Sequence, residues 1–255
     1  MNRYRNNPLR SINWYRKLAL MKGRRETGFF LMEGDRAIRQ VIDISPASIN
    51  EIVTSRDLPP IYSVYRQRRL SEIQLRSICH TSAPQGPVAV ICYPVEVYTS
   101  HLPKTTGRKI LLLEDIQDPG NAGTLVRTAA AFDYDGVIMS DRCADPFSPK
   151  FIQSSSGSIL SLWLRRTPGY IAMVEQLKKK GYPVIVAALD GADRPGVLER
   201  REKLLLALGN EAAGPSESLR SMAEHNINID ITRKKAESLN VAVCGAICLY
   251  LSNKR

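Results

Sequence analysis

Short apolar runs alternate with amphipathic segments along the chain. In the N-terminal third, such runs predict strands at residues 29–32, 49–54, 61–64 and 88–93. The spacing of apolar residues predicts helices at residues 12–22, at the segment after Gly34 that carries Ile38, Val41 and Ile42, and at residues 70–77. Gly23 should end the first of these helices. This alternation indicates a small α/β domain.

The pattern starts afresh after a polar stretch at residues 94–107, where we expect the linker. Apolar runs then predict strands at residues 110–113, 136–139, 183–189, 203–208 and 227–231. Helices are expected at residues 121–132, 171–180 and 235–251. The fold class predicted for this part is α/β, a doubly wound and mostly parallel sheet. The predicted domains are residues 1–104 and 105–255.

Positive charge changes the picture of the N-terminal part. The 255 residues include 36 Lys+Arg and 25 Asp+Glu, a net charge of +11. The first 25 residues carry eight basic side chains and no acidic one. Such an excess favours a polyanionic partner, nucleic acid before membrane. The basic arm at residues 1–25 has three interpretations, which the sequence leaves open: a phosphate-binding arm, a solvated tail or a mitochondrial presequence.

Several classes of protein are disfavoured by what the chain lacks. The longest apolar stretch, residues 241–251, is too short to span a membrane, and the N-terminus has no apolar core of a secretory signal. The five cysteines are odd in number and form no C-x-x-C pair, and the three histidines show no metal-ligand spacing. We therefore expect a cytoplasmic protein with reduced thiols and no metal site, with a mitochondrial location as the alternative.

Three polar loops are the candidate site for chemistry. They lie at residues 118–130, 208–214 and 237–243. Their glycines permit close backbone approach, and Asn121 and Asn240 lie where helix N-termini would favour an anion. Arg127, if partly buried among alanines, would need a carboxylate or phosphate partner. No dinucleotide fingerprint or phosphate loop is present. Each loop taken alone is also compatible with ordinary turns and caps.

Taken together, residues 121–129, 209–214 and 238–246 resemble the signature motifs of the SPOUT-class RNA ribose methyltransferases, the SpoU/TrmH branch. Residues 17–34 and 85–89 are similar to the start and the closing strand of that family's accessory RNA-binding domain. The chain departs from the family pattern at Asp230, where members commonly have proline, and at Cys244-Gly245.

The resemblance implies a deep trefoil knot in the C-terminal domain and S-adenosylmethionine as cofactor. By position, the family's cofactor contacts fall at Gly209, Ile229 and Leu239, with Leu189, Leu208 and Ala242 as further candidates. The catalytic arginine would be Arg127, as a base or as a stabiliser of negative charge. The residues that would arrange the site around it are Asn121, Glu211, Ser238 and Asn240.

The resemblance also implies the partners. The acceptor would be a ribose 2′-hydroxyl of structured RNA, with ribosomal RNA favoured over transfer RNA, and the active unit would be a homodimer that pairs through the knot. The expected RNA-binding residues are Arg16, Lys17, Lys22, Arg24, Arg25 and Lys150. Two rival hypotheses are a catalytically silent RNA-binding homologue and a small-molecule methyltransferase. The intact motifs disfavour the first, and the N-terminal charge disfavours the second.

Overall fold

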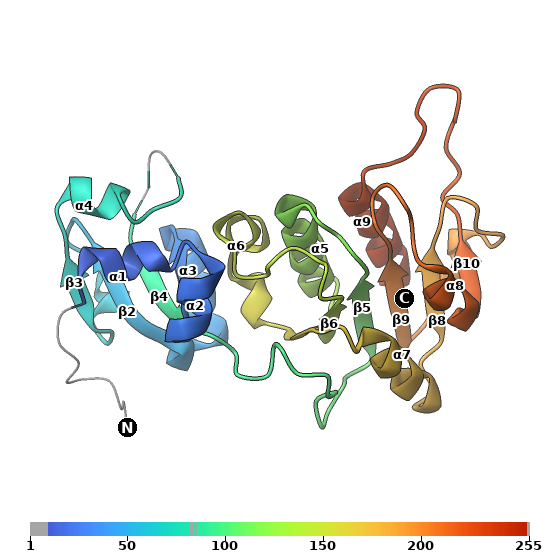
Figure 1. The fold of residues 1–255 in the computed structure, drawn as a ribbon, viewed down its shortest axis with the longest axis horizontal. Helices are drawn as coiled ribbons and strands as arrows, with labels where there is room; N and C mark the ends of the chain where they lie inside the picture. Colours follow the sequence, from blue (N-terminus) through green and yellow to red (C-terminus); the bar gives the residue numbers. More distant parts are fainter. Residues whose placement is uncertain (1–9, 82–83, 85, 254–255) are drawn as a thin grey trace. The chain divides into compact units, whose positions relative to one another are not determined.

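The chain divides into two compact units (Figure 1). The structure is a computed structural model that describes residues 10–81, 84 and 86–253. Unit 1 comprises Met1–Pro94 and Asp145–Leu160, and unit 2 comprises Val95–Ala144 and Ser161–Arg255. The observed division therefore differs from the predicted domains in two respects. The first unit ends earlier than residue 104, and it also takes up the segment Asp145–Leu160 from the C-terminal half.

Unit 1 is built on a four-stranded mixed sheet. Its strands, in spatial order, are β1 (Phe29–Glu33), β4 (Val88–Cys92), β2 (Ile49–Thr54) and β3 (Gln67–Arg69). Strand β4 is antiparallel to both β1 and β2, whereas β3 is parallel to β2. Strands β1, β4 and β2 are the predicted ones, because their apolar runs are wholly or partly buried. Strand β3 was not predicted, since as an edge strand it consists of polar and charged residues.

Short helices pack around this sheet. They are α1 (Ile12–Lys17), α2 (Met21–Thr27), α3 (Asp35–Ile44), α4 (Glu72–Arg76) and α6 (Pro149–Ser155), with 3₁₀ turns η1 (Pro46–Ser48), η2 (Pro60–Tyr62) and η3 (Ser156–Leu160). Helix α3 buries Ile38 and Val41, three residues apart on one face. Part of the core consists of Tyr15, Leu18, Val53, Leu70, Leu75, Ile78, Val88 and Val90.

Two predictions for unit 1 were wrong. Gly23 does not end a helix but lies buried inside α2, where an added Cβ would come within 2.1 Å of the Lys17 carbonyl oxygen. The first helix ends earlier, at Lys17. Residues 61–64 form no strand, because Pro59 and Pro60 begin the turn η2 instead. That turn buries Tyr62, whose hydroxyl donates to Asp35 at 2.7 Å.

Unit 2 contains a six-stranded sheet in which every pair is parallel. Its strands, in spatial order, are β10 (His225–Ile227), β8 (Val184–Ala187), β9 (Leu204–Leu208), β5 (Lys109–Leu113), β6 (Gly136–Met139) and β7 (Trp163–Arg166). The predicted α/β class with a mostly parallel sheet is therefore confirmed. Strand β7 was not predicted, because its arginines hide the apolar pattern. Arg165 is nevertheless buried, paired with Glu96 and with the His101 carbonyl.

Helices cover both faces of this sheet. They are α5 (Pro119–Ala131), α7 (Tyr170–Lys179), α8 (Glu217–Met222) and α9 (Val241–Ser252), with the turn η4 (Pro195–Leu198). Helices α7 and α8 share a core with Ile110, Leu112 and Leu205. Helices α5 and α9 pack on each other (Figure 1). At Gly245 of α9 a Cβ would lie 2.2 Å from Leu125 and 2.6 Å from Leu208, so glycine permits this close approach.

Candidate active site

The carboxyl ends of three neighbouring strands meet at one edge of the parallel sheet. Leu113 of β5 pairs with Leu208 of β9, which in turn pairs with Ala187 of β8. The loops that follow these strands therefore begin side by side. In open α/β sheets this edge is where ligands bind. The loop after β9 carries one polar motif, the loop after β5 leads into the motif on α5, and the third motif opens α9.

A pocket opens at this edge. Its interior measures about 100 Å³, and about 710 Å³ when its open mouth is included. Five of the six residues predicted to bind the cofactor line it, namely Leu189, Leu208, Gly209, Ile229 and Leu239. Glu211 and Ser238 also line the pocket. The walls are thus mainly apolar side chains and glycine backbone, with one carboxylate and one hydroxyl at the edge.

Ala242 is the exception, because it is not among the residues that line this pocket. It is buried in the first turn of α9, where its N–H donates to the Asn240 side chain at 2.8 Å. It contributes instead to a shallow apolar hollow, which we call the α9 face. The residues of the α9 face are Thr124, Ala242, Val243, Ala246, Ile247, Tyr250 and Leu251. Val243 and Tyr250 are half exposed, at 50% and 55%.

Hydrogen bonds join residues of all three motifs. The Asn240 side-chain amide donates to the Asn121 side-chain oxygen at 3.1 Å. The Asn121 amide donates in turn to the Glu211 carboxylate at 3.2 Å. This chain fixes the orientation of the Asn121 side chain from both ends, and it ends at the pocket wall. Glu211 is therefore the acidic partner of the Asn121 side-chain amide.

The two helix N-termini at the site are already capped. The Asp118 side chain accepts from the Asn121 backbone N–H at 2.9 Å at the start of α5. The Asn240 side chain accepts from the N–H groups of Ala242 and Val243 at the start of α9. These caps satisfy N–H groups that the sequence analysis had considered as anion ligands. Asn240 thus both caps a helix and holds Asn121.

Glu114 organises the site but was missed in the sequence. It is 3% exposed and accepts hydrogen bonds from the Ser216 N–H and hydroxyl, at 2.7 and 2.6 Å, which ties the end of β5 to the loop after β9. The Tyr170 hydroxyl donates to it at 2.6 Å. Burial, followed by this hydrogen bond, raises the pKa of Tyr170, so the phenol stays neutral and donates. The available signal was a charged residue placed directly after a continuous apolar strand.

Arg127 lies exposed on α5, outside the buried stripe formed by Ala122, Leu125, Val126 and Ala129. Within the described part of the chain its side chain makes no hydrogen bond or ion pair. The acidic partner considered in the sequence is therefore not observed, and solvent hydrates the guanidinium. Arg127 follows Thr124 by three positions and shares its side of the helix. Thr124 belongs to the α9 face, so Arg127 is a near neighbour on α5 of one residue of that face.

Two further positions stand apart from the polar chain. Ser238 lines the pocket and is exposed. Asp230, which replaces the family's usual proline, is also exposed. It does not cap α9, because that helix begins at Val241 rather than at residue 235 as predicted. Its neighbour Ile229 keeps its place in the pocket wall.

Comparison with known proteins identifies the family. The sequence profile of the SpoU rRNA Methylase family matches residues 108–250. The chain is also 33% identical over 247 residues to the 23S rRNA (guanosine(2553)-2′-O)-methyltransferase RlmP of Bacillus subtilis, an alignment that covers 92% of this chain and 93% of that protein. The chain belongs to the SpoU family.

Solved structures agree with this SpoU assignment. A TrmH-family putative RNA methyltransferase from Porphyromonas gingivalis superposes with a TM-score of 0.79 at 27% identity, covering 96% of this chain and 98% of that one. The SpoU methyltransferase AviRb from Streptomyces viridochromogenes, solved in complex with AdoMet, gives 0.81 at 24% identity, covering 95% and 96%. At that identity the second likeness concerns the fold alone.

The basic residues expected to bind RNA fall into two groups in this SpoU protein. Five of them are exposed, namely Arg16, Lys17, Lys22, Arg25 and Lys150. Arg24 differs, because it is buried. Its guanidinium pairs with Asp145 at 2.5 Å and donates to the carbonyls of Leu18 and Ala19. All these partners belong to unit 1, so Arg24 has a structural role and is withdrawn from the RNA-binding set.

Replacing Arg24 by alanine should lower the free energy of unfolding by about 3–5 kcal/mol, because Asp145 would remain buried without its partner. Urea denaturation followed by circular dichroism measures this loss. Arg25→Ala is the matched control, since the next residue of α2 is exposed and its loss should cost less than about 0.5 kcal/mol. Equal losses for the two variants would contradict the structural role of Arg24.

The basic arm lies only partly within the described residues. Arg3 and Arg5 fall outside them, whereas Arg10 is described. The Arg10 guanidinium stacks over the Trp14 ring at 3.9 Å and lies 3.7 Å from the Glu51 carboxylate. Its burial lowers the pKa of Arg10, and Glu51 opposes that shift. Arg10 is therefore packed against unit 1 and is a poor candidate for a mobile phosphate contact.

The described residues hold no group of three or more His, Cys, Asp or Glu side chains that could bind a metal ion. Within the same residues, no helix is long and apolar enough to cross a membrane. The five cysteines are all free thiols.

Proposed function

We propose that this protein transfers a methyl group from S-adenosylmethionine to a ribose 2′-hydroxyl in structured RNA. The observation that carries this proposal is the chain of hydrogen bonds from Asn240 through Asn121 to Glu211, which joins three motifs of a SpoU protein at the wall of one pocket. The full-length relative from Bacillus subtilis bears the name of a 23S rRNA 2′-O-methyltransferase, which supports the same reaction.

The pocket fits the proposed cofactor in its chemistry. Leu189, Ile229 and Leu239 supply apolar walls suited to a flat adenine ring, and a pocket of this kind needs only a few placed polar groups. Gly209 has no room for a side chain, because an added Cβ would lie 2.1 Å from the Pro215 nitrogen. Its backbone therefore stays close to the loop and open to the pocket. Among the predicted residues, Gly209, Leu208, Leu189, Ile229 and Leu239 would hold the cofactor.

The bound cofactor supplies an activated methyl group on its sulfonium. The protein must then place the acceptor and help to remove its proton. Asn121, held by Asn240 and Glu211, presents a fixed amide next to Glu211, which lines the pocket. Arg127 is a hydrated cation on the same helix, suited to an RNA phosphate or to charge that develops on the ribose oxygen. A guanidinium stays protonated in proteins, which argues against its action as a general base.

We extend the proposal to the organisation of the chain. Unit 1 acts as the RNA-binding accessory domain and unit 2 as the methyltransferase domain, whose C-terminal segment forms the trefoil knot. The active unit is a homodimer, and the α9 face supports this, since half-exposed Val243 and Tyr250 lie on it. Ribosomal RNA is the favoured substrate, in the cytoplasm. Transfer RNA is the alternative, because another relative is an uncharacterised tRNA/rRNA methyltransferase of Synechocystis.

Methylation of RNA tests this proposal directly. The purified protein, given labelled S-adenosylmethionine and ribosomal RNA from cells that lack the gene, should form one 2′-O-methylated nucleoside, detected by mass spectrometry after digestion. Transfer RNA from the same cells should receive no label. Methylation of a base alone would contradict the mechanism. Absence of both transfer and cofactor binding by calorimetry would identify a silent homologue instead.

A further inference from the structure

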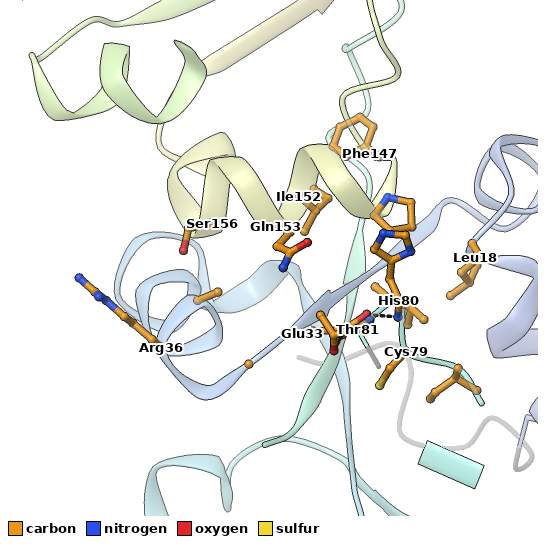
Figure 2. A pocket seen from close by; sticks show the side chains of 16 residues that line it. Leu18, Glu33, Arg36, Cys79, His80, Thr81, Phe147, Ile152, Gln153 and Ser156 are labelled. Carbon is orange, nitrogen blue, oxygen red and sulfur yellow. Dashed lines mark hydrogen bonds between the residues drawn. The ribbon is translucent and has the colours of Figure 1, made fainter. Parts of the chain in front are cut away.

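Unit 1 contains a cavity of about 370 Å³ that the reaction proposed above does not use (Figure 2). It lies among the end of β1, the first turn of α3, the segment 78–81 and helix α6. Its apolar lining is formed by Leu18, Leu31, Ile78, Phe147 and Ile152. The volume suits a small flat ligand, since pockets for such molecules begin at about 300 Å³.

The cavity edge carries few polar groups, and the hydrogen bonds of Glu33 are known. The Glu33 carboxylate accepts from the His80 N–H at 2.5 Å and from the Thr81 N–H and hydroxyl at 3.3 and 2.6 Å. A carboxylate offers about four acceptor positions, so one remains on Oε1. Figure 2 shows Gln153 pointing from α6 toward the side on which Glu33 and His80 lie. The edge therefore presents one remaining carboxylate acceptor and one amide, which can both donate and accept.

The exposed charged residues in and beside the lining are cations, whereas the described lining itself holds a single carboxylate. Three exposed cations belong to the lining or adjoin it in the sequence: Arg36 lines the cavity, Lys17 precedes the lining residue Leu18, and Lys150 follows the lining residue Pro149. The only carboxylate of the described lining is Glu33. A phosphate inside would meet this carboxylate and an apolar lining, whereas a phosphate outside would meet the cations. The arrangement favours a ligand with a neutral flat ring attached to a phosphate.

We propose that this cavity receives a single unstacked nucleobase of the RNA strand, with an exocyclic amino group donating to Glu33 Oε1. The flanking phosphates would lie at Lys17, Arg36 and Lys150. The inference rests on the proposed function, since it takes RNA as the partner. Proteins read single-stranded RNA by accepting splayed-out bases in this manner. Cytosine, adenine and guanine carry an amino group, whereas uracil does not, so uracil should bind least.

Mononucleotides test the chemistry of the ligand. Ile78 and Ile152 line the cavity, so we expect their δ1 methyl signals to report on it by NMR. Millimolar CMP, AMP and GMP should shift both signals, UMP should shift them least, and ribose 5-phosphate should leave them unchanged. Shifts of equal size with ribose 5-phosphate would show a phosphate site and overturn the proposal. Affinity for a free mononucleotide equal to that for ribosomal RNA would also overturn it, in favour of a nucleotide effector.

Substitutions at the cavity test its contribution to RNA binding. Ala37→Phe fills the cavity, and Gln153→Ala removes an exposed amide from α6 with little risk to folding. Each should weaken binding of purified ribosomal RNA about tenfold, the scale of losing one base contact. Gln176→Ala, at an exposed position of α7 in unit 2, is the matched control and should bind as the wild type does. Unchanged affinity in Gln153→Ala and in a folded Ala37→Phe would refute the inference.

The two proposals fail in different ways. If nucleotides shift the methyl signals of Ile78 and Ile152 but no ribose is methylated, the base-binding cavity is supported and the proposed activity is contradicted. If ribose is methylated while Ala37→Phe and Gln153→Ala bind and methylate RNA as the wild type does, the proposed activity is supported and the base-binding cavity is contradicted. RNA binding measured without S-adenosylmethionine reports on the cavity without any contribution from catalysis.

Discussion

Arg127→Ala should lower the rate of methyl transfer by about two orders of magnitude or more, the scale of losing an electrostatic contact made in the transition state. Arg127 is exposed on α5 and lacks a partner among the described residues, so its removal leaves no buried charge behind. The folded protein and its cofactor affinity should therefore hardly change. Single-turnover transfer to RNA and calorimetric titration with S-adenosylmethionine measure the two quantities separately.

Two further variants sharpen the test of Arg127. Lys179→Ala removes an exposed cation from α7 and controls for a general loss of positive charge. Arg127→Lys keeps the charge but loses the planar fork, so recovery of part of the rate would indicate that charge alone contributes. A loss of cofactor affinity as large as the loss of rate would move Arg127 from the acceptor side of the site into the cofactor pocket.

The strands that the sequence predicted most directly are those in which consecutive apolar residues are all buried. Strand β9 is buried at every position from Leu204 to Leu208, and β6 from Gly136 to Met139, so their apolar runs had no other good explanation. The polar loops could be placed because they follow such strands. Five predicted pocket residues accordingly lie in one pocket although they come from four separate segments.

The failures at Arg24, strand β7 and Glu114 share a different physical origin, since burial of a charged residue depends on a distant partner. Arg24 and Asp145 are 121 positions apart, and nothing near Arg24 distinguishes it from the exposed Arg25. Strand β7 was missed for the same reason, because its buried Arg165 pairs with Glu96, 69 positions away. The buried Glu114 likewise depends on Ser216 and Tyr170. Residue type predicts exposure for isolated charges, whereas paired charges require the three-dimensional structure.

The second large effect concerns sites shared between two subunits. Asn121 and Asn240 contact each other, whereas Arg127 lies about 9 Å further along α5, at 1.5 Å per residue, and on the side of Thr124. That side borders the α9 face, which a second copy would cover. We expect a two-fold pairing through this face to bring Arg127 of each subunit toward the pocket of its partner. The site would then combine Arg127 of one chain with Asn121 and Asn240 of the other.

Mixing two inactive homodimers tests this geometry. Arg127→Ala and Asn240→Ala should each be nearly inactive alone, and Asn240→Asp, which keeps an oxygen to cap α9, controls for loss of the cap. If the site is composite, a mixed dimer holds one site with both residues intact. Equal amounts, left to exchange subunits, should then recover about a quarter of wild-type activity, because half of the dimers are mixed and each has one good site.

If each subunit instead carries a complete site, every site in a mixed dimer is damaged and mixing restores nothing. Exchange itself is followed by native mass spectrometry of subunits that differ in isotope label, so a failure to recover activity after complete exchange would rule out the shared site. Before the mixing experiment, light scattering at micromolar concentration measures the oligomeric state of the wild-type protein. A monomer there would contradict the dimer, because the exposed α9 face would then have no second copy to cover it.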